Sequence, residues 1–288
     1  MFWQQVLNGL SLGSVYALVA LGFVILWKSA EVLNFAQGDF MMLGAFLSFT
    51  FIKLWGMPIW LSFILSILLV GLLGGLLEKI FMRPLLGEPI FAIAILTLGL
   101  SYIIQAIAGM IWGYITKKFP PYVSEEAIEF VGLVVAPIQL VIIITTICIV
   151  IIMAVFLKFF KVGIAMRAVG LNQLASIYLG VNVKKFLSLN WVIAGAIGSI
   201  AGIILAPLMF FDVHMGTIGL KAMPAAVLGG FTSFPGAIVG GFIIGIAENL
   251  AAGYFATGVK DIVPWIVLYI ILIIRPAGIF GTTQVKRV

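Results

Sequence analysis

The feature that most constrains the fold of this chain is a series of long stretches that contain no charged residue. They cover residues 1–27, 54–77, 89–116, 130–157, 186–211 and 222–247. A helix that spans a bilayer needs about 20 apolar residues, and each of the first five stretches is long enough. Only 9% of the 288 residues are charged, against roughly 25% in soluble domains. Most of the surface therefore cannot face water, and the sequence predicts a polytopic membrane protein.

The first stretch is predicted to be a permanent helix rather than a cleavable signal peptide. It carries no basic residue before its apolar part, and its first charge is Lys28. The single cysteine, Cys148, lies within an apolar stretch and cannot form an intramolecular disulfide. We expect Cys148 to be a small buried apolar residue.

The predicted fold class is an all-α polytopic membrane protein with about 8–9 transmembrane helices, an inverted repeat and broken helices. Helices are expected at about 2–27, 33–55, 58–82, 89–115, 137–160, 186–211, 235–257 and 261–281. The segment 217–231 contains Lys221, Pro224 and several glycines, so we expect a broken or half-length helix there. Such a backbone is tolerated at membrane depth only inside protein or along a wet cavity. No polar stretch is long enough to form a soluble domain, so any activity that needs a soluble domain must belong to other chains.

The distribution of basic residues predicts the orientation. One connection between apolar stretches holds Lys158, Lys161, Arg167, Lys184 and Lys185. Because Lys and Arg are enriched in cytoplasmic loops, this loop is predicted to be cytoplasmic, with the N-terminus outside. The C-terminal Lys286 and Arg287 then lie inside if 217–231 crosses the membrane, which gives nine crossings. The alternative is eight crossings with a re-entrant 217–231.

The two halves of the chain resemble each other. "LNGLSLGSVYALVALGF" (7–23) is similar to "LNWVIAGAIGSIAGIIL" (189–205), and similar pairs follow downstream in each half. We therefore expect one transmembrane domain over 1–288, with a first repeat at about 1–115, a linking helix at 137–160, a cytoplasmic coupling loop at 158–185 and a second repeat at about 186–281. Five helices precede the second copy, so the copies would be inverted. Inverted repeats with interrupted helices are typical of transporters, whose path lies between the repeats.

Polar residues in apolar surroundings identify a candidate translocation path. "LNFAQGDFMMLGAF" (33–46) places amide and carboxylate groups beside glycines, and its repeat partner is the broken segment around Lys221. Polar groups inside a membrane usually face a partner or a wet pathway. The candidate path residues are Asn34, Gln37, Gly38, Asp39, Thr97, Gly99, Lys221, Ala225 and Gly229, with Ala226 and Leu228 as further small or apolar walls. The alternative is that the stretch only packs helices together, with Asn34 as a helix cap.

The cytoplasmic loop contains a short helix with a signal at each end. Asn172 is a good N-cap, and Gly180 is a good residue to follow a helix. A helix of about two turns is unstable alone in water, so it is expected to dock against a partner. The candidate coupling residues are Arg167, Asn172, Leu174, Ser176, Ile177, Tyr178, Leu179 and Gly180. The alternative is an interfacial helix that lies on lipid headgroups.

The remaining polar residues give no sign of an enzyme. One histidine, His214, and one cysteine are too few for a usual structural zinc site, and no metal or cofactor is expected on this chain. The chain has no G-x-x-x-x-G-K-[ST] loop for ATP phosphates. Lys221 and Glu248 both fall in the outer half of the predicted topology, and we expect them to pair.

Three stretches together resemble signature sequences of the branched-chain amino acid ABC importer permeases. They are "LNFAQGDFMMLGAF", "KVGIAMRAVGLNQLASIYLGVNVKK" and "GLKAMPAAVLGGFTSFPGAIVGG", and the likeness is greatest to the shorter, first-type permease subunit. Gln37 stands where many relatives have histidine, and "GD" (38–39) where "GE" is common. Relatives that import urea or short amides share similar motifs.

This resemblance implies a type II importer in a bacterial or archaeal cell (inner) membrane. A second permease subunit, which makes a heterodimer, would complete the path. Two cytoplasmic ATPase subunits would hold ATP and Mg²⁺, one seating the helix of 171–180 in a groove, and an extracytoplasmic protein would deliver the amino acid. No nucleic acid is expected as a partner. The alternatives are a urea or amide importer and, less favoured, a self-sufficient ion-coupled carrier.

Overall fold

The structure is a computed structural model that describes residues 1–85, 87–124, 126–130, 132–255 and 257–281. Its α-helices are α1 (Phe2–Ala30), α2 (Gln37–Lys53), α3 (Ile59–Leu77), α4 (Ile90–Trp112), α5 (Pro137–Phe159), α6 (Lys161–Leu171), α7 (Gln173–Tyr178), α8 (Val183–Leu205), α9 (Gly216–Leu220), α10 (Ala222–Gly229), α11 (Phe234–Tyr254) and α12 (Val263–Ile274). A π-helical turn, η1 (Glu78–Met82), and a 3₁₀ turn, η2 (Arg83–Leu85), extend α3. A second 3₁₀ turn, η3 (Thr257–Asp261), precedes α12.

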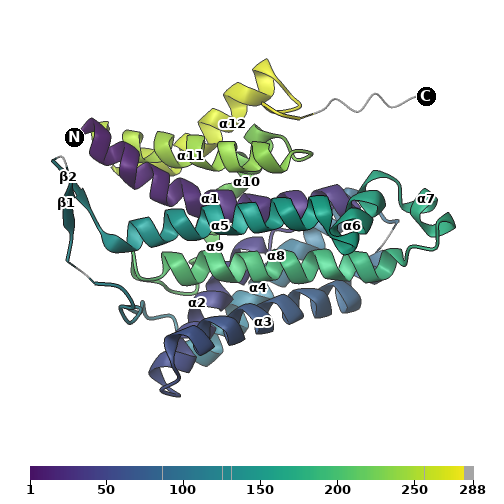
Figure 1. The fold of residues 1–288 in the computed structure, drawn as a ribbon, viewed down its shortest axis with the longest axis horizontal. Coiled ribbons are helices and arrows are strands. Elements are labelled where there is room, and N and C mark those ends of the chain that lie inside the picture. Colours follow the sequence, from purple (N-terminus) through teal and green to yellow (C-terminus); the bar gives the residue numbers. More distant parts are fainter. Residues whose placement is uncertain (86, 125, 131, 256, 282–288) are drawn as a thin grey trace.

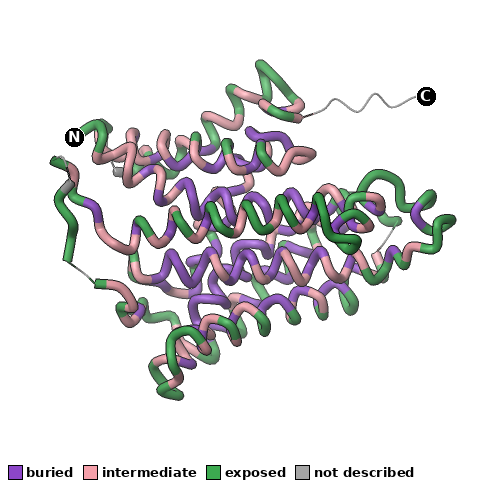
Figure 2. Tube along the Cα trace, viewed as in Figure 1, coloured by how far each residue is buried: buried purple, intermediate pink, exposed green. Residues whose placement is uncertain are grey.

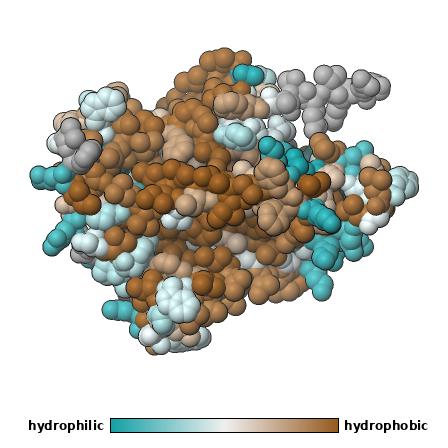
Figure 3. All heavy atoms as spheres, viewed as in Figure 1, coloured by the Kyte–Doolittle hydropathy of each residue, from teal (hydrophilic) through white to brown (hydrophobic). Residues whose placement is uncertain are grey.

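Six of these helices are long and apolar enough to cross a membrane: α1, α3 with its extension, α4, α5, α8 and α11. They lie side by side with their axes close to one direction, and α7 and the N-terminus lie at opposite ends of the bundle (Figure 1). Hydrophobic side chains cover the middle of the face in Figure 3, and hydrophilic ones gather towards the two ends. The predicted all-α polytopic class is confirmed, whereas the choice between eight and nine crossings stays a prediction.

Helix α1 lies at the centre of the bundle, and every residue from Gly13 to Leu26 is buried (Figure 2). It packs mainly against α11 and α8, and α8 in turn packs against α3 and α2. The two largest helix contacts, α1 with α11 and α8 with α3, are the pairs that the sequence repeat would relate to each other. The repeat itself stays a prediction.

Helix α2 begins inside the bundle rather than at its end. The expected helix over 33–55 starts only at Gln37, because the preceding residues form a turn in which the Asn34 side chain accepts a hydrogen bond from the Ala36 amide (3.1 Å). The Gln37 side chain donates to the carbonyl oxygen of Ala194, in the middle of α8 (3.0 Å). The interruption expected within 217–231 is confirmed, since α9 and α10 are separate helices that meet at Lys221.

Three features differ from the sequence-based expectations or lie beyond them. The loop at 115–136 contains a hairpin of β1 (Ile128–Phe130) and β2 (Leu133–Val135), and the Gln4 side-chain amide bonds to both backbone groups of Val134. The expectation that Cys148 is buried is wrong, because α5 is covered on only one side and Cys148 is exposed. Lys286 and Arg287, used above to orient the C-terminus, lie outside the described residues.

Candidate functional site

The first turns of α2 and α9 meet in the interior through main-chain atoms. A Cβ atom on Gly38 would overlap the Gly216 carbonyl oxygen, and one on Gly219 would overlap the Gly38 Cα atom. Only glycine permits so close an approach of two backbones. The sequence-predicted interrupted segments of the two halves are therefore in direct contact.

Asp39 lies in the first turn of α2, beside this contact, and is almost fully buried. Its Oδ1 atom accepts a hydrogen bond from the Gln105 side chain of α4 (3.0 Å). Its Oδ2 atom is buried and receives no hydrogen bond within the described part of the chain. The N-terminal end of a helix favours a nearby negative charge, so its position in α2 helps to stabilise the carboxylate.

The turn before α2 is held to α4 and α8 by buried polar groups. The Thr97 hydroxyl on α4 accepts a hydrogen bond from the Phe35 amide (3.2 Å) and lies 3.0 Å from the Leu33 carbonyl oxygen. Asn34 and Gln37 are fully buried, with the Asn34 amide 3.5 Å from Gln37 Oε1. These bonds satisfy polar groups that would otherwise be costly to bury.

Most of the predicted path residues are packed inside this chain. Those that are buried are Asn34, Gln37, Gly38, Asp39, Thr97, Ala225, Ala226, Leu228 and Gly229. Lys221 is half-buried, and Gly99 is exposed on α4 with no atom near the position of a Cβ. Gly99 is therefore the one predicted path residue that faces outward from the fold. A lining role stays a prediction for all of these residues, Gly99 included.

Lys221 is the centre of a charged cluster between α9, α10, α11 and η3. Its Nζ atom lies 2.9 Å from Glu248 Oε1, which confirms the predicted pair, and it also pairs with Asp261. The Tyr16 hydroxyl donates to Glu248 Oε2 (2.6 Å). The hydrogen bond from Lys221 is the main reason that the pKa of Asp261 lies below its ordinary value. Tyr16 and Asp261 could not be predicted as members of this cluster, because both are distant from Lys221 in the chain and ordinary in their local context.

A second buried ion pair lies near the α7 end of the bundle. Glu78 pairs with Arg83 (3.0 Å), and both contact the Ser188 hydroxyl on α8. Within the described residues, no group of three or more His, Cys, Asp or Glu side chains could hold a metal ion.

Helix α7 is capped at both ends by its own loop, as the sequence predicts. The Asn172 side chain accepts a hydrogen bond from the Ala175 amide (2.9 Å). At the other end Gly180 has φ +80°, and the Val181 amide donates to the Ser176 carbonyl oxygen (2.9 Å). This is the Schellman arrangement, which favours glycine at the left-handed position.

The surface of α7 is apolar and faces away from the bundle. Its side chains and those beside it are largely exposed, at 69% for Leu174, 55% for Ile177, 88% for Tyr178 and 80% for Leu179. Ser176 is buried and bonds to the Asn172 carbonyl oxygen. Ser176 therefore holds the loop together, whereas the four apolar residues are available to a partner.

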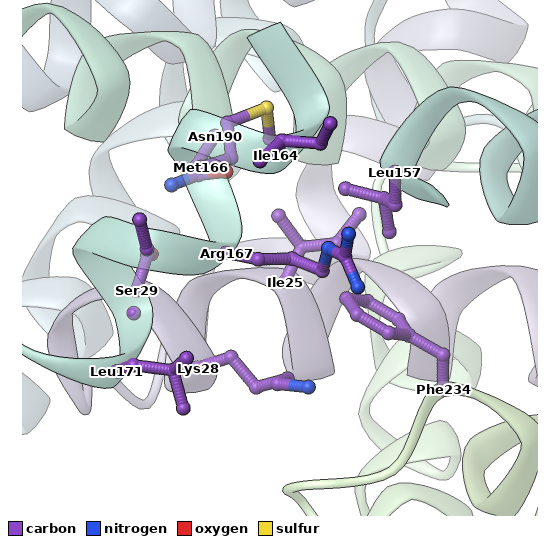
Figure 4. Close-up of a pocket in the computed structure, with 12 residues that line it drawn as sticks. Ile25, Lys28, Ser29, Leu157, Ile164, Met166, Arg167, Leu171, Asn190 and Phe234 are labelled. Atoms are coloured by element: carbon purple, nitrogen blue, oxygen red, sulfur yellow. The ribbon is translucent and has the colours of Figure 1, made fainter. Parts of the chain in front are cut away.

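Arg167 belongs to a different place from α7. It lies on α6 and lines a cavity of about 450 Å³ between α1, α5, α6 and the start of α11. Figure 4 shows Arg167 and Lys28 on the walls of this cavity, close to Phe234. The structure thus separates Arg167 from the other predicted coupling residues.

The sequence matches a family model described as the permease component of the branched-chain amino acid transport system, over residues 5–272. A high-affinity branched-chain amino acid permease protein, LivH of Salmonella typhimurium, is 32% identical over 100% of this chain and 98% of its own length. BraD of Pseudomonas aeruginosa is 30% identical with the same coverage. A probable LivH of Methanocaldococcus jannaschii is 27% identical over 98% of this chain and 94% of its own.

The fold is also similar to a solved chain of PsaBC from Streptococcus pneumoniae in complex with Fab. That likeness has a TM-score of 0.51 at 14% identity and covers 94% of this chain and 91% of the other. At so low an identity it shows the fold alone. The family match over most of the chain and the full-length relatives show that this chain belongs to the family of permease components of the branched-chain amino acid transport system.

Proposed function

We propose that this chain is one of two permease subunits of an ATP-driven importer for branched-chain or other hydrophobic amino acids. The observation that carries the proposal, beyond the family itself, is helix α7. It is preformed by its own caps and presents four exposed apolar side chains at one end of the bundle. An exposed apolar surface of this kind marks an interaction site, and an ion-coupled carrier has no need of one.

The proposed partner at α7 is a cytoplasmic ATPase subunit. ATP and Mg²⁺ are held by that subunit, and α7 transmits its movement to the membrane helices. Within this loop α6 packs directly on α1, because a Cβ on Gly170 would press against the Lys28 carbonyl oxygen. A displacement of α7 is therefore transmitted through α6 to the central helix α1.

The substrate path is proposed to lie against the outward face of α4, between this chain and a second permease chain. Gly99 provides a small, open position there, and the partly buried Gln105–Asp39 hydrogen bond lies between α4 and the junction of α2 and α9. Leucine or valine is a zwitterion with an apolar tail, so a path with few charges would release it readily. Recognition is then left to an extracytoplasmic binding protein.

The test of this function is ATP-driven uptake of labelled leucine by proteoliposomes that contain the complete complex. We expect uptake only with ATP inside and binding protein outside, with urea failing to compete with leucine. Leu179→Asp places a charge on the exposed face of α7, and we expect uptake to fall at least tenfold while ATP hydrolysis continues. Leu54→Asp is the matched control, because Leu54 is 69% exposed at the other end of the bundle.

Uptake by this chain alone, driven by an ion gradient, would contradict the proposal. Normal coupling in Leu179→Asp would remove α7 as the ATPase dock. Competition by urea instead of by leucine or valine would reassign the substrate to short amides.

A further inference from the structure

The cavity beside Arg167 continues into an apolar groove along the side of the bundle. The cavity of about 450 Å³ and a second one of about 530 Å³ share four lining residues: Lys28, Leu157, Arg167 and Phe234. Together they form one open feature, which we call the basic groove. Its walls come from α1, α5, α6 and the first turns of α11, with Asn190 of α8 at one side.

The walls of the basic groove are apolar over about two helical turns. On α5 they are Val150, Met153, Ala154 and Leu157, whose spacing places them on one face of the helix. On α1 the groove runs from Leu21 to Lys28, a length of about 10 Å at 1.5 Å per residue. These dimensions suit the upper part of an extended acyl chain.

The mouth of the groove is basic. Lys28, Lys158 and Arg167 come from three helices and line the groove. None of them takes part in an ion pair recorded among the described residues, and the two lysines instead lie over aromatic rings, Lys28 at 4.8 Å from Phe234 and Lys158 at 5.3 Å from Phe159.

No acidic residue lines the basic groove in the part of the chain that the structure describes. Glu31 lines an adjacent polar cavity and forms no recorded ion pair with Lys28. Like charges that share an apolar, water-poor mouth repel each other unless an anion lies between them. The three cations at the mouth therefore have no anionic partner among the described residues that line the groove.

We propose that the basic groove binds one anionic phospholipid of the surrounding bilayer. The phosphate group accepts hydrogen bonds from Lys28, Lys158 and Arg167, and one acyl chain lies between α5 and α11. Basic residues at the ends of spanning helices lie at headgroup depth, and basic pockets between such helices on the cytoplasmic side bind anionic headgroups. A free phosphate would leave the apolar walls uncovered, and a neutral lipid would leave the cations unbalanced.

The experiment uses the full-length chain, purified in a neutral detergent and titrated with phosphatidylglycerol under native mass spectrometry. We expect one lipid to be retained per chain. Phosphatidylcholine and glycerol 3-phosphate, tested in parallel, are expected to bind at least tenfold more weakly. Lys28→Gln with Arg167→Gln should weaken phosphatidylglycerol binding at least tenfold. The control is Lys184→Gln with Lys185→Gln, which removes two exposed cations of α8 that do not line the groove.

A second variant tests the apolar half of the site without changing any charge. Ala154→Trp fills the groove from its exposed position on α5, and we expect it also to exclude the lipid. If the double variant Lys28→Gln with Arg167→Gln fails to fold, lipid binding by Lys158→Gln and Ala154→Trp tests the proposal in its place. Equal binding of phosphatidylcholine, full competition by glycerol 3-phosphate, or unchanged binding in the folded variants would each overturn the proposal. Because the readout is lipid retention, it is independent of whether the chain imports amino acids.

Discussion

Lys221, Glu248 and Asp261 form an unequal triad. Glu248 is nearly buried, with 4% of its side chain exposed, whereas Asp261 is 57% exposed. Without Glu248, Lys221 would still pair with Asp261. Among the described residues Glu248 has only the Tyr16 hydroxyl as a partner besides Lys221. Removing one partner of a buried pair leaves an uncompensated charge, at a cost of about 3–5 kcal/mol.

This asymmetry predicts which substitution is worse. Lys221→Met leaves the buried Glu248 carboxylate without its cationic partner. It should therefore lower the unfolding temperature more than Glu248→Gln, which leaves Lys221 paired with Asp261. The double variant should be more stable than Lys221→Met alone. Thermal unfolding of the detergent-purified chain measures all three, with Asp261→Asn as a control that should change little because exposed pairs contribute at most about 1 kcal/mol. Additive effects would mean that Lys221 and Glu248 do not interact.

At the scale of single elements, the sequence predicted more of the helices than of their surroundings. The long helices, the interruption at Lys221 and both caps of α7 follow from local patterns of apolar, capping and glycine residues. The local sequence does not show which face of a helix meets lipid, the rest of the chain or a partner subunit, since all three kinds of face are apolar here. For this reason the sequence predicts a buried Cys148 where the structure has an exposed one, and it does not distinguish the exposed Gly99 from the buried Gly38.

The same distinction decides how the path is best tested. Gly38 and Gly229 are both predicted path residues, but a tryptophan at either position does not test the path alone. In the structure a side chain at either position would overlap main-chain atoms of the same chain, so both variants are expected to disturb the fold itself.

Gly99→Trp is the sharper variant, because a side chain there meets open space. We expect normal yield and unfolding temperature, but at least tenfold lower uptake by the complete complex in proteoliposomes, since the ring would protrude into the path. Leu72→Trp on the exposed face of α3, where Leu72 is 63% exposed, should keep uptake. Full uptake with Gly99→Trp would show that this face of α4 does not border the path.

At the scale of the whole molecule, the direction of each helix limits the topology. Both α8 and α11 begin at the α7 end: Phe234, the first residue of α11, contacts Lys28 in the last turn of α1. The chain between α8 and α11 must then return along the bundle. This return begins near Phe211, which pairs with Lys117 just after the C-terminal end of α4. It ends at Gly229, the last residue of α10. This arrangement favours nine crossings over eight.

Cysteine labelling tests that topology. In a Cys148→Ser background, Gly258→Cys in η3 and Glu88→Cys before α4 introduce exposed thiols at opposite ends of the bundle. We expect a membrane-impermeant maleimide to label Gly258→Cys in intact cells and Glu88→Cys only after permeabilisation. The background protein, with no thiol, is the control. The reverse pattern would invert the proposed orientation, and labelling of neither in intact cells would favour eight crossings.

The contact between Gly38 and Gly216 has a consequence for how such a protein can evolve. Where two side chains meet, a larger residue on one helix can be accommodated by a smaller one on the other. Where two main chains meet, no smaller residue exists, so a first methyl group on either side has no compensating exchange. Residues on the exposed faces of α3 and α5 can be replaced by other apolar residues over long divergence. The junction of the two halves is expected to stay fixed while the rest of the transporter changes around it.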